Sequence, residues 1–442
     1  MKSSRQFTIF SKKHTPRLQY VLEVLIGQLL GWDFQFVSHR DEFLNAATPK
    51  ISYGDEKVSN GTFRIPAHSL LFENGITNQE VCFFEHLGLP VFFKVEAEAS
   101  DLPFDLFAVC FFLISRYEEY LPFEKDRHGR FTAQQSEAFR GGFLRQPLVN
   151  QWAEKLKELL RAKFPNLTFP TSEHAFQPTY DVDYAWAYRN KGLLRTIGGY
   201  LMNVKRLDFK TLAERWKVHF FKKTDPFFTF DYLDELHLKY QLKPLYFFLL
   251  GDYGKWDKNI PHTNPLFRKL IYRIHQNQAV GIHPSYGSNY RKEGIQKEKE
   301  RLENITGEKV TRSRQHFLKL SFPTTCRKLL AAGIREDFTM GYASEIGFRA
   351  SIAMPYFWYD LEEEKRTDLL IHPFQVLDVA LQQYLKLSPQ EAVAEVLPII
   401  EIVKKAGGVF STIWHNSSLS DEKEWDGWKA VYETIVEAAN NS

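Results

Sequence analysis

The stretch Pro178-Thr179-Tyr180-Asp181-Val182-Asp183-Tyr184 places two carboxylates two residues apart at the end of a predicted strand, residues 176–184. Side chains i and i+2 of a strand leave the same face, so Asp181 and Asp183 are expected to point the same way. Two such charges repel unless a metal ion or a shared proton relieves them. With a metal, one carboxylate coordinates and the other acts as a base toward water. The alternative is a strand-end turn with two solvated aspartates.

The composition predicts an ordinary globular protein. The chain has 442 residues, 44% of them apolar and 25% charged, and this length predicts two or three domains. The formal net charge is only +3, with Lys and Arg spread along the chain, so composition gives no reason to expect nucleic-acid binding. Aromatic residues make up 15%, which suits large cores and surface platforms for sugar rings.

The cysteines and the N-terminus favour a cytoplasmic location. The three cysteines, Cys82, Cys110 and Cys326, have no CxxC spacing and fit reduced thiols better than a disulfide framework. Residues 21–30 contain Glu and Gln and lack a small-residue cleavage site, so they predict an amphipathic helix rather than a signal peptide. No apolar run approaches the roughly 18 residues of a membrane span.

The first part of the chain predicts a small α/β domain, residues 1–165. Strands are expected at 7–10, 34–37 and 50–53, and helices at 16–30, 105–120 and 152–164. The polar segment 124–146 is expected to be an extended surface loop. We favour a solvated connector there, with a loop that reaches over the second domain as the alternative. The Pro-, Asn- and Thr-rich residues 165–172 mark the domain boundary.

Residues 174–442 alternate between strand and helix patterns. Strands are predicted at 176–183, 244–250, 279–284, 313–320, 337–342, 368–372 and 409–415. Helices are predicted at 225–240, 265–278, 292–305, 323–332, 389–406 and 424–440. Such alternation predicts mainly parallel strands covered by helices. We expect an irregular, closed or nearly closed (β/α) barrel, with a doubly wound open sheet as the alternative. In a barrel, functional residues gather at the carboxyl ends of the strands.

Polar residues recur at those predicted ends. They include a His-Pro pair and a closing Trp-His pair, and the candidates are His283, Arg314, His316, Asp337, His372 and His415. Histidine binds divalent metals and moves protons near neutral pH. Each residue taken alone also fits a structural role, such as an internal ion pair of Arg314 with Asp337. Their recurrence at the strand ends of one domain favours a shared site.

In the order of these motifs, residues 174–440 resemble the polysaccharide deacetylase family, the NodB-type metal-dependent carbohydrate esterases. Residues 179–183 are similar to the first family motif, 283–285 to the second and 414–415 to the last, while Arg314 and Asp337 match the third and fourth. Residues 341–350 look like a divergent bacterial branch, and the N-terminal region resembles its accessory domain. The resemblance therefore implies a barrel of the deacetylase type.

The resemblance also implies roles for these residues. Asp181 would be the general base and His415 the general acid, with Arg314 and Asp337 orienting and tuning the pair. Asp183 and His283 would bind a divalent metal, expected to be zinc. The family pattern has a second histidine four residues after the first, where this chain has Gly287, and His316 is our candidate substitute. Val182 also separates two aspartates that the family keeps adjacent or nearly so.

The expected activity is hydrolysis of N- or O-acetyl groups on a saccharide. Tyr184, Trp186, Tyr286 and Trp414 could stack on sugar rings or pack in the barrel. Because of Gly287, the alternatives are a catalytically inactive carbohydrate-binding protein and an assembly protein of a polysaccharide pathway. A barrel metallohydrolase acting on a non-sugar amide is a further alternative. Nucleophilic catalysis is disfavoured, because Ser285 and Cys326 lack a paired base in the sequence. The oligomeric state stays open.

Overall fold

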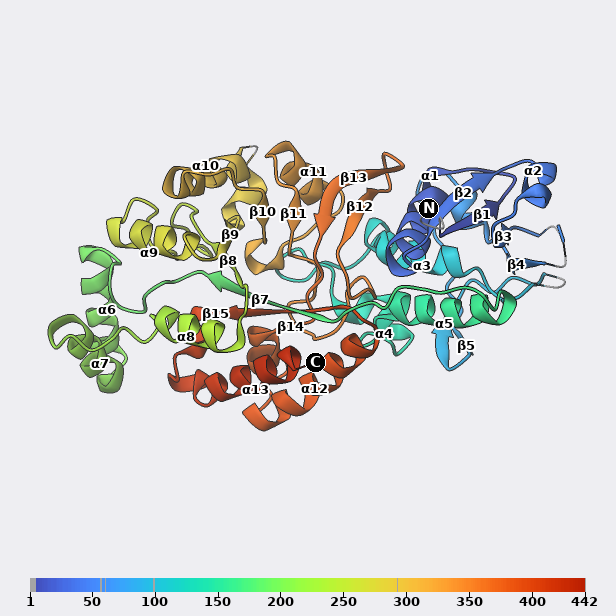
Figure 1. The fold of residues 1–442 in the computed structure, drawn as a ribbon. Helices are drawn as coiled ribbons and strands as arrows, with labels where there is room; N and C mark the ends of the chain where they lie inside the picture. Colours follow the sequence, from blue (N-terminus) through green and yellow to red (C-terminus); the bar gives the residue numbers. More distant parts are fainter. Residues whose placement is uncertain (1–4, 56–57, 60, 98–99, 292, 442) are drawn as a thin grey trace.

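The computed structural model describes residues 5–55, 58–59, 61–97, 100–291 and 293–441. It contains two mostly parallel sheets, one in each part of the chain (Figure 1). The first has the strand order β2-β1-β3-β4, and the second has nine strands. No helix in the described ranges has the length and apolar character to cross a bilayer.

The N-terminal sheet is built from short parallel strands. They are β1 (Gln6–Phe10), β2 (Asp33–Val37), β3 (Lys50–Tyr53) and β4 (Thr62–Ile65). Helix α1 (Pro16–Leu22) continues as a π-helical segment, Glu23–Leu29, and α3 (Leu106–Ile114) is buried on all sides. The three strands predicted here are present, and β4 is an additional one.

The second sheet runs in the order β12-β13-β11-β10-β9-β8-β7-β15-β14. The strands are β7 (Ala175–Val182), β8 (Leu245–Phe248), β9 (Ala279–Ile282), β10 (Arg312–Ser313), β11 (Glu336–Asp337), β12 (Tyr356–Asp360), β13 (Lys365–Ile371), β14 (Val376–Leu377) and β15 (Val409–His415). All neighbours pair in parallel except β12 with β13. The mostly parallel sheet is thus confirmed. The edge strands β12 and β14 do not pair with each other within the described residues, so closure into a barrel stays a prediction.

Helices lie along the sheet as the alternation predicts. Helices α9 (Pro265–His275) and α10 (Gly294–Thr306) pack against β9. Helix α12 (Pro389–Lys405) packs against β15, and α13 (Trp428–Asn440) packs against β7 and α12 (Figure 1). The remaining helices are α8 (Phe230–Tyr240) and α11 (Thr324–Ala331), and two that the sequence did not predict, α6 (Leu193–Lys205) and α7 (Phe209–Phe220).

Two predicted strands are much shorter than expected. The strand predicted at 313–320 ends at Ser313, and His316–Leu318 form a 3-10 turn. The strand predicted at 337–342 ends at Asp337 instead of beginning there. In both cases the residues after the strand carry buried polar side chains that hydrogen-bond to the neighbouring strand end: Arg314 donates to the Phe338 carbonyl, and Thr339 Oγ1 accepts from the Gln315 N–H. The alternating pattern of the sequence therefore extends beyond the residues whose backbone pairs in the sheet.

The two sheets are joined by a shared hydrophobic core and by buried ion pairs. One apolar cluster runs from Phe7 to Ala439. Glu119, in a 3-10 turn after α3, accepts hydrogen bonds from Arg116 Nε at 2.8 Å and from Arg349 Nε at 2.9 Å. All three side chains are at most 4% exposed. The predicted division into residues 1–165 and 174–442 stays a prediction, because the two parts share a core.

We expect Glu119→Gln to lower the free energy of unfolding by about 3 to 5 kcal/mol, because it leaves the buried Arg349 without its carboxylate and leaves Arg116 with Glu118 alone. Burial alone would raise the pKa of Glu119, but Arg349 and Arg116 hold it below its usual value. A lowered pKa stabilises the fold above the unfolded pKa, and this stabilisation is lost as the pH falls through the folded one. The difference between wild type and variant should therefore shrink below about pH 4.

Urea unfolding between pH 3 and pH 8 measures this difference. Glu158→Gln is the matched control, because its ion pair with Lys155 is exposed, and it should change stability by no more than about 0.5 kcal/mol. Equal effects of the two substitutions would contradict a structural role of the Glu119 cluster.

Candidate metal centre

The register of the sheet brings the predicted site residues to one edge. Asp181 lies opposite His415 in the pairing of β7 with β15. Ile282 pairs with Phe248 and Ser313 pairs with Ile282, so His283 and Arg314 follow directly at the same carboxyl edge. Parallel strands end together, which is why residues more than 200 positions apart meet here.

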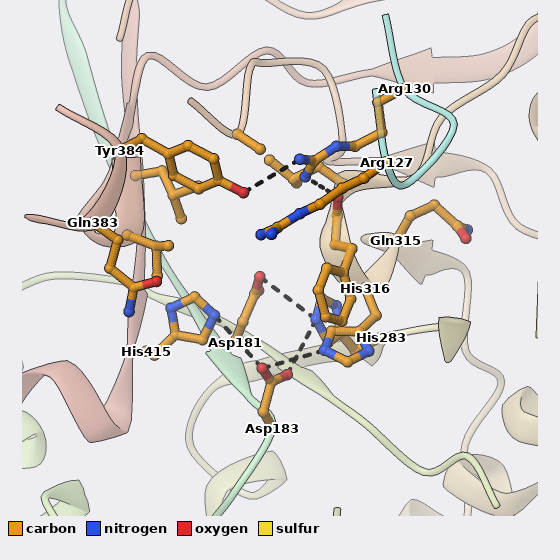
Figure 2. Close-up of a pocket in the computed structure, with 15 residues that line it drawn as sticks. Arg127, Arg130, Asp181, Asp183, His283, Gln315, His316, Gln383, Tyr384 and His415 are labelled. Atoms are coloured by element: carbon orange, nitrogen blue, oxygen red, sulfur yellow. Dashed lines mark hydrogen bonds and ion pairs between the residues drawn. The ribbon is translucent and has the colours of Figure 1, made fainter. Parts of the chain in front are cut away.

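A pocket of about 200 Å³ opens at this edge. Its floor is formed by Asp181, Asp183, His283, His316 and His415 (Figure 2). Five of the seven residues that the sequence analysis assigned to the site therefore line one cavity.

Asp183 lies at the centre of the floor. Its Oδ1 is 3.3 Å from His283 Nε2, and its Oδ2 is 3.4 Å from His316 Nε2 and 3.8 Å from His415 Nε2. Figure 2 shows the three imidazoles converging on this carboxylate from different strand ends. The side chain of Asp183 is only 15% exposed, so its charge needs compensation by these neighbours.

The tautomers of the two nearer histidines follow from their other ring nitrogen. His283 Nδ1 lies 2.6 Å from the Arg314 carbonyl oxygen, which can only accept, so Nδ1 carries the proton. His316 Nδ1 lies 2.9 Å from Asp257 Oδ1 and donates in the same way. When neutral, both rings therefore present the Nε2 lone pair toward Asp183, the orientation of metal-bound histidines with an anchoring acceptor behind them.

The deacetylase family pattern has a metal-binding histidine at position 287, and Gly287 has a different role in this site. Its backbone N–H donates to Asp257 Oδ2 at 3.0 Å, and the N–H of Tyr286 donates to Asp257 Oδ1 at 2.7 Å. Asp257 in turn orients His316. The loop at Gly287 therefore supports His316 through Asp257.

These residues fit a divalent cation. Ligand atoms of Asp183, His283 and His316 lie within 4.8 Å of one another. Atoms held about 2.1 Å from a tetrahedral ion are about 3.4 Å apart. Each oxygen of Asp183 has one imidazole nitrogen at about this distance: Oδ1 lies 3.3 Å from His283 Nε2, and Oδ2 lies 3.4 Å from His316 Nε2. The Asp183 Oδ1 atom is buried without a hydrogen-bond partner among the described residues. One carboxylate and two imidazoles are a ligand set that can hold a divalent metal ion.

The pKa values of Asp183 and His316 are shifted by the charged side chains around them. Burial would raise the pKa of Asp183, but His316 and His283 hold it well below its usual range. Burial would lower the pKa of His316, but Asp183 and Asp257 raise it to about 9. A proton on His316 thus occupies the position that a cation would take, and binding of a metal has to displace it.

Asp181 lies beside the three-ligand group without belonging to it. Arg314 Nη1 donates to Asp181 Oδ1 at 2.9 Å and to Thr179 Oγ1 at 2.7 Å, and Arg314 Nε donates to the Phe338 carbonyl at 3.0 Å. The guanidinium is fully buried. It fixes one oxygen of Asp181 and leaves Oδ2, which lies 3.8 Å from His283 Nε2, facing the pocket.

His415 is held by a carboxylate that the sequence analysis missed. Asp378, which follows β14, accepts from the His415 N–H at 2.7 Å, and its Oδ1 lies 2.9 Å from His415 Nδ1. Burial would lower the pKa of His415, but Asp378, followed by Asp183 and Asp181, raises it to about 10. The imidazole is therefore protonated at neutral pH, and its Nε2–H faces the pocket.

Asp337 and His372 lie apart from the pocket lining. The Asp337 carboxylate accepts from Ser313 Oγ at 2.8 Å and from Thr339 Oγ1 at 2.9 Å. It acts on Arg314 only through its charge. The predicted direct ion pair of Arg314 is therefore formed with Asp181 instead. His372 Nε2 lies 3.2 Å from Glu336, and its ring stacks on Phe338.

The rim of the pocket comes partly from the N-terminal part of the chain. Arg127 and Arg130, from the polar segment 124–146, line it together with Tyr384. Arg130 donates to the Phe317 carbonyl at 2.8 Å, so the segment reaches over the second sheet, the alternative that we had not favoured. The exposed Arg127 guanidinium points into the pocket (Figure 2). In the sequence, the run of charged residues in segment 124–146 was the only signal that this segment could contribute to the site.

Comparison with known proteins gives three results. Residues 7–165 match the model of a family of unknown function, DUF7033. No curated protein sequence matches the chain. Solved structures of polysaccharide deacetylases do.

The resemblance is structural and distant. A candidate polysaccharide deacetylase from Mycobacterium smegmatis has 14% identity and a TM-score of 0.40, over 62% of this chain and 86% of that one. A probable polysaccharide deacetylase from Pseudomonas aeruginosa has 9% identity and a TM-score of 0.38, over 60% and 84%. The polysaccharide deacetylase Bc1974 from Bacillus cereus has 11% identity and a TM-score of 0.30, over 61% and 87%. What the site does is therefore inferred below from its geometry.

We expect the purified chain to bind one zinc ion and His316→Ala to weaken this binding at least about 100-fold, because it removes one of three ligands. Asp257→Asn should weaken it about 10- to 100-fold, because the anchor of His316 loses its charge. Isothermal titration calorimetry of the metal-free protein measures both effects. The matched control is His372→Ala, which removes a strand-end histidine outside the pocket. Equal affinities of His316→Ala and wild type would contradict this ligand set.

Proposed function

We propose that the chain is a metal-dependent hydrolase that removes an acetyl group from a saccharide. The observation that carries this proposal is the convergence of His283, His316 and His415 on Asp183, with a second carboxylate, Asp181, beside them. This arrangement offers a three-ligand cation site, a base and a protonated imidazole in one pocket. These are the groups that hydrolysis of an unactivated amide needs.

Asp183, His283 and His316 would hold the cation, with zinc favoured by the two nitrogen ligands. The bound ion supplies Lewis-acid chemistry, which activates water at neutral pH and draws negative charge onto the acyl oxygen. Asp181 accepts the proton of the attacking water through the oxygen that faces the pocket. Arg314 orients this carboxylate, because its buried guanidinium donates to Oδ1 and leaves the other oxygen toward the pocket.

His415 completes the reaction on the other side of the acyl group. Its Nε2–H donates a proton to the leaving amine as the carbon–nitrogen bond breaks, giving acetate and a free amino sugar. Asp378 holds the ring in the orientation that this transfer requires and stabilises its positive charge. Water supplies one proton to Asp181 and the hydroxyl group to acetate, and His415 supplies one proton to the amine. The starting state returns when Asp181 releases its proton to solvent and His415 takes one up.

The residues at the rim of the pocket favour a polar substrate. Arg127, Gln383 and Tyr384 present hydrogen-bonding groups around the opening, which suits a hydroxylated ring better than an apolar amide. The aromatic residues expected from the sequence contribute less. Trp414 is fully buried and Trp186 is 7% exposed, so both pack in the core. A pocket of about 200 Å³ suits the acetyl group and part of one sugar ring.

An inactive carbohydrate-binding protein is the alternative, and Gly287 is the observation that favours it. A backbone N–H replaces an imidazole at this position, so the cation site depends on His316 and its support by Asp257.

Metal content and acetate release from a panel of N- and O-acetylated sugars test the proposal. We expect the zinc-loaded wild type to release acetate. Asp181→Asn should keep its zinc and lose about 100- to 10,000-fold in kcat, because it removes the base but no ligand. Asp183→Ala should lose both. A zinc-loaded wild type that binds a sugar of the panel without releasing acetate would refute the hydrolase and favour the binding protein.

The role of His415 can be tested separately through the leaving group. We expect Asp378→Asn and His415→Ala to lower kcat for an N-acetyl sugar about 100-fold or more, because the amine leaves only when protonated. Both variants should keep most of the activity toward p-nitrophenyl acetate, whose leaving group needs no proton. Equal losses on the two substrates would show that these residues support the site as a whole rather than donate the proton.

A further inference from the structure

The hairpin formed by α6 and α7 carries an unusual share of the exposed apolar surface. It projects beyond the end of β7 as a green pair of helices (Figure 1). Of the 21 large apolar side chains exposed in the described ranges, 11 belong to this hairpin. They are Leu193, Leu194, Ile197, Leu201, Met202, Val204, Leu207, Phe209, Trp216, Phe220 and Phe221.

The spacing of these residues gives each helix an apolar stripe. Leu193, Ile197, Leu201 and Val204 recur at intervals of three or four residues along α6. Phe209, Trp216 and Phe220 lie seven and then four residues apart on α7. Positions with this spacing lie on one side of a helix. Such stripes normally face a core, but here the side chains are between 47% and 75% exposed.

The same segment is strongly basic. Residues 189–223 contain ten Lys and Arg against two Asp and Glu, a net charge of +8 in a chain whose total is +3. The rest of the protein is therefore acidic overall. Exposed residues such as Lys205, Arg206 and Lys210 stand next to the apolar stripes. Apolar side chains flanked by Lys and Arg on short helices are typical of segments that lie in the interface of an anionic bilayer.

We propose that the α6–α7 hairpin docks this protein on the surface of a membrane that contains anionic lipids. The apolar stripes would enter the boundary between headgroups and acyl chains, and the basic residues would contact lipid phosphates. A second copy of the chain fits the apolar stripes less well, because the hairpins of both copies carry a net charge of +8 and would repel each other. The helices have 13 and 12 residues, so the hairpin lies on the bilayer and does not span it.

Docking at this place would hold the pocket near the lipid surface. The hairpin follows β7, which contains Asp181 and is followed directly by Asp183. Arg195 of α6 donates from Nη1 to the Asn259 carbonyl at 2.9 Å and from Nη2 to the Lys258 carbonyl at 2.6 Å. These carbonyls belong to the loop that carries Asp257. The hairpin is therefore tied to the edge of the sheet that holds the candidate metal centre.

Binding of the full-length protein to vesicles tests this proposal, independently of any enzymatic activity. We expect cosedimentation with vesicles of phosphatidylcholine and phosphatidylglycerol at a ratio of three to one. Partitioning into pure phosphatidylcholine vesicles should be at least about tenfold weaker, and binding to the anionic vesicles should fall as salt is added.

Two double variants separate the two contributions. Lys205→Glu with Arg206→Glu should lower partitioning into anionic vesicles at least about tenfold, because each basic residue near the surface contributes to binding. Leu193→Ser with Leu194→Ser should lower it by a similar factor, because two side chains that are 75% and 86% exposed no longer enter the interface. Both variants should keep the wild-type melting temperature, because the altered side chains are exposed in the folded protein.

Matched controls lie outside the hairpin. Leu238→Ser with Leu266→Ser alters residues that are 82% and 56% exposed, and Lys239→Glu with Lys243→Glu reverses two exposed charges. Both should bind anionic vesicles like the wild type.

Three results would overturn the proposal. The first is a wild type that does not bind anionic vesicles. The second is equal binding of hairpin and control variants. The third is a stable dimer in solution that the Leu193 and Leu194 substitutions dissociate, since a second copy would then cover the stripes.

Discussion

The buried charge of Asp183 is the constraint on which the rest of the site depends. A carboxylate that is 15% exposed at the end of a central strand is costly unless a positive charge lies next to it. The chain provides three imidazoles for this purpose, and acceptors behind them set their direction. Without a metal, a proton on His316 compensates the charge. With a metal, the same atoms become ligands, so one arrangement serves both states.

Much of this site could be predicted from the sequence because parallel strands end at a common edge. The spacing of Asp181 and Asp183 indicated two carboxylates on one face, and both line the pocket. His316 was predicted as a substitute ligand because it belongs to a neighbouring strand end and was expected to share a face with Arg314. Its ring does reach Asp183, although the strand ends at Ser313, seven residues earlier than predicted, and a 3-10 turn carries the histidine. The predicted order of the strands was enough to place His316 near Asp183, although the predicted length of its strand was wrong.

The groups that the sequence did not reveal lie in irregular backbone. Asp257 is in the long loop after β8, and Asp378 follows a strand of two residues, which is too short for an alternating pattern. The α6–α7 hairpin was missed for a related reason. Its apolar residues have helical spacing, but Gly198 and Gly199 lie in the middle of α6 and lower its helix propensity. Most of its large apolar side chains are exposed, while Val218 packs with Ala187 and Tyr188 in a small cluster apart from the main core. Patterns of burial predict elements that a large core holds, and this hairpin has few residues in one.

Gly287 acts on the site through its backbone and not through a side chain. Its N–H donates to Asp257 Oδ2, and Asp257 orients His316. A Cβ at position 287 would lie 3.6 Å from Asp257 Oδ2, which is an ordinary van der Waals distance, so this contact does not exclude a side chain there. Because any residue except proline supplies the same N–H, the anchor of His316 depends on the conformation of the loop and not on the glycine. Gly287 is therefore compatible with an intact cation site.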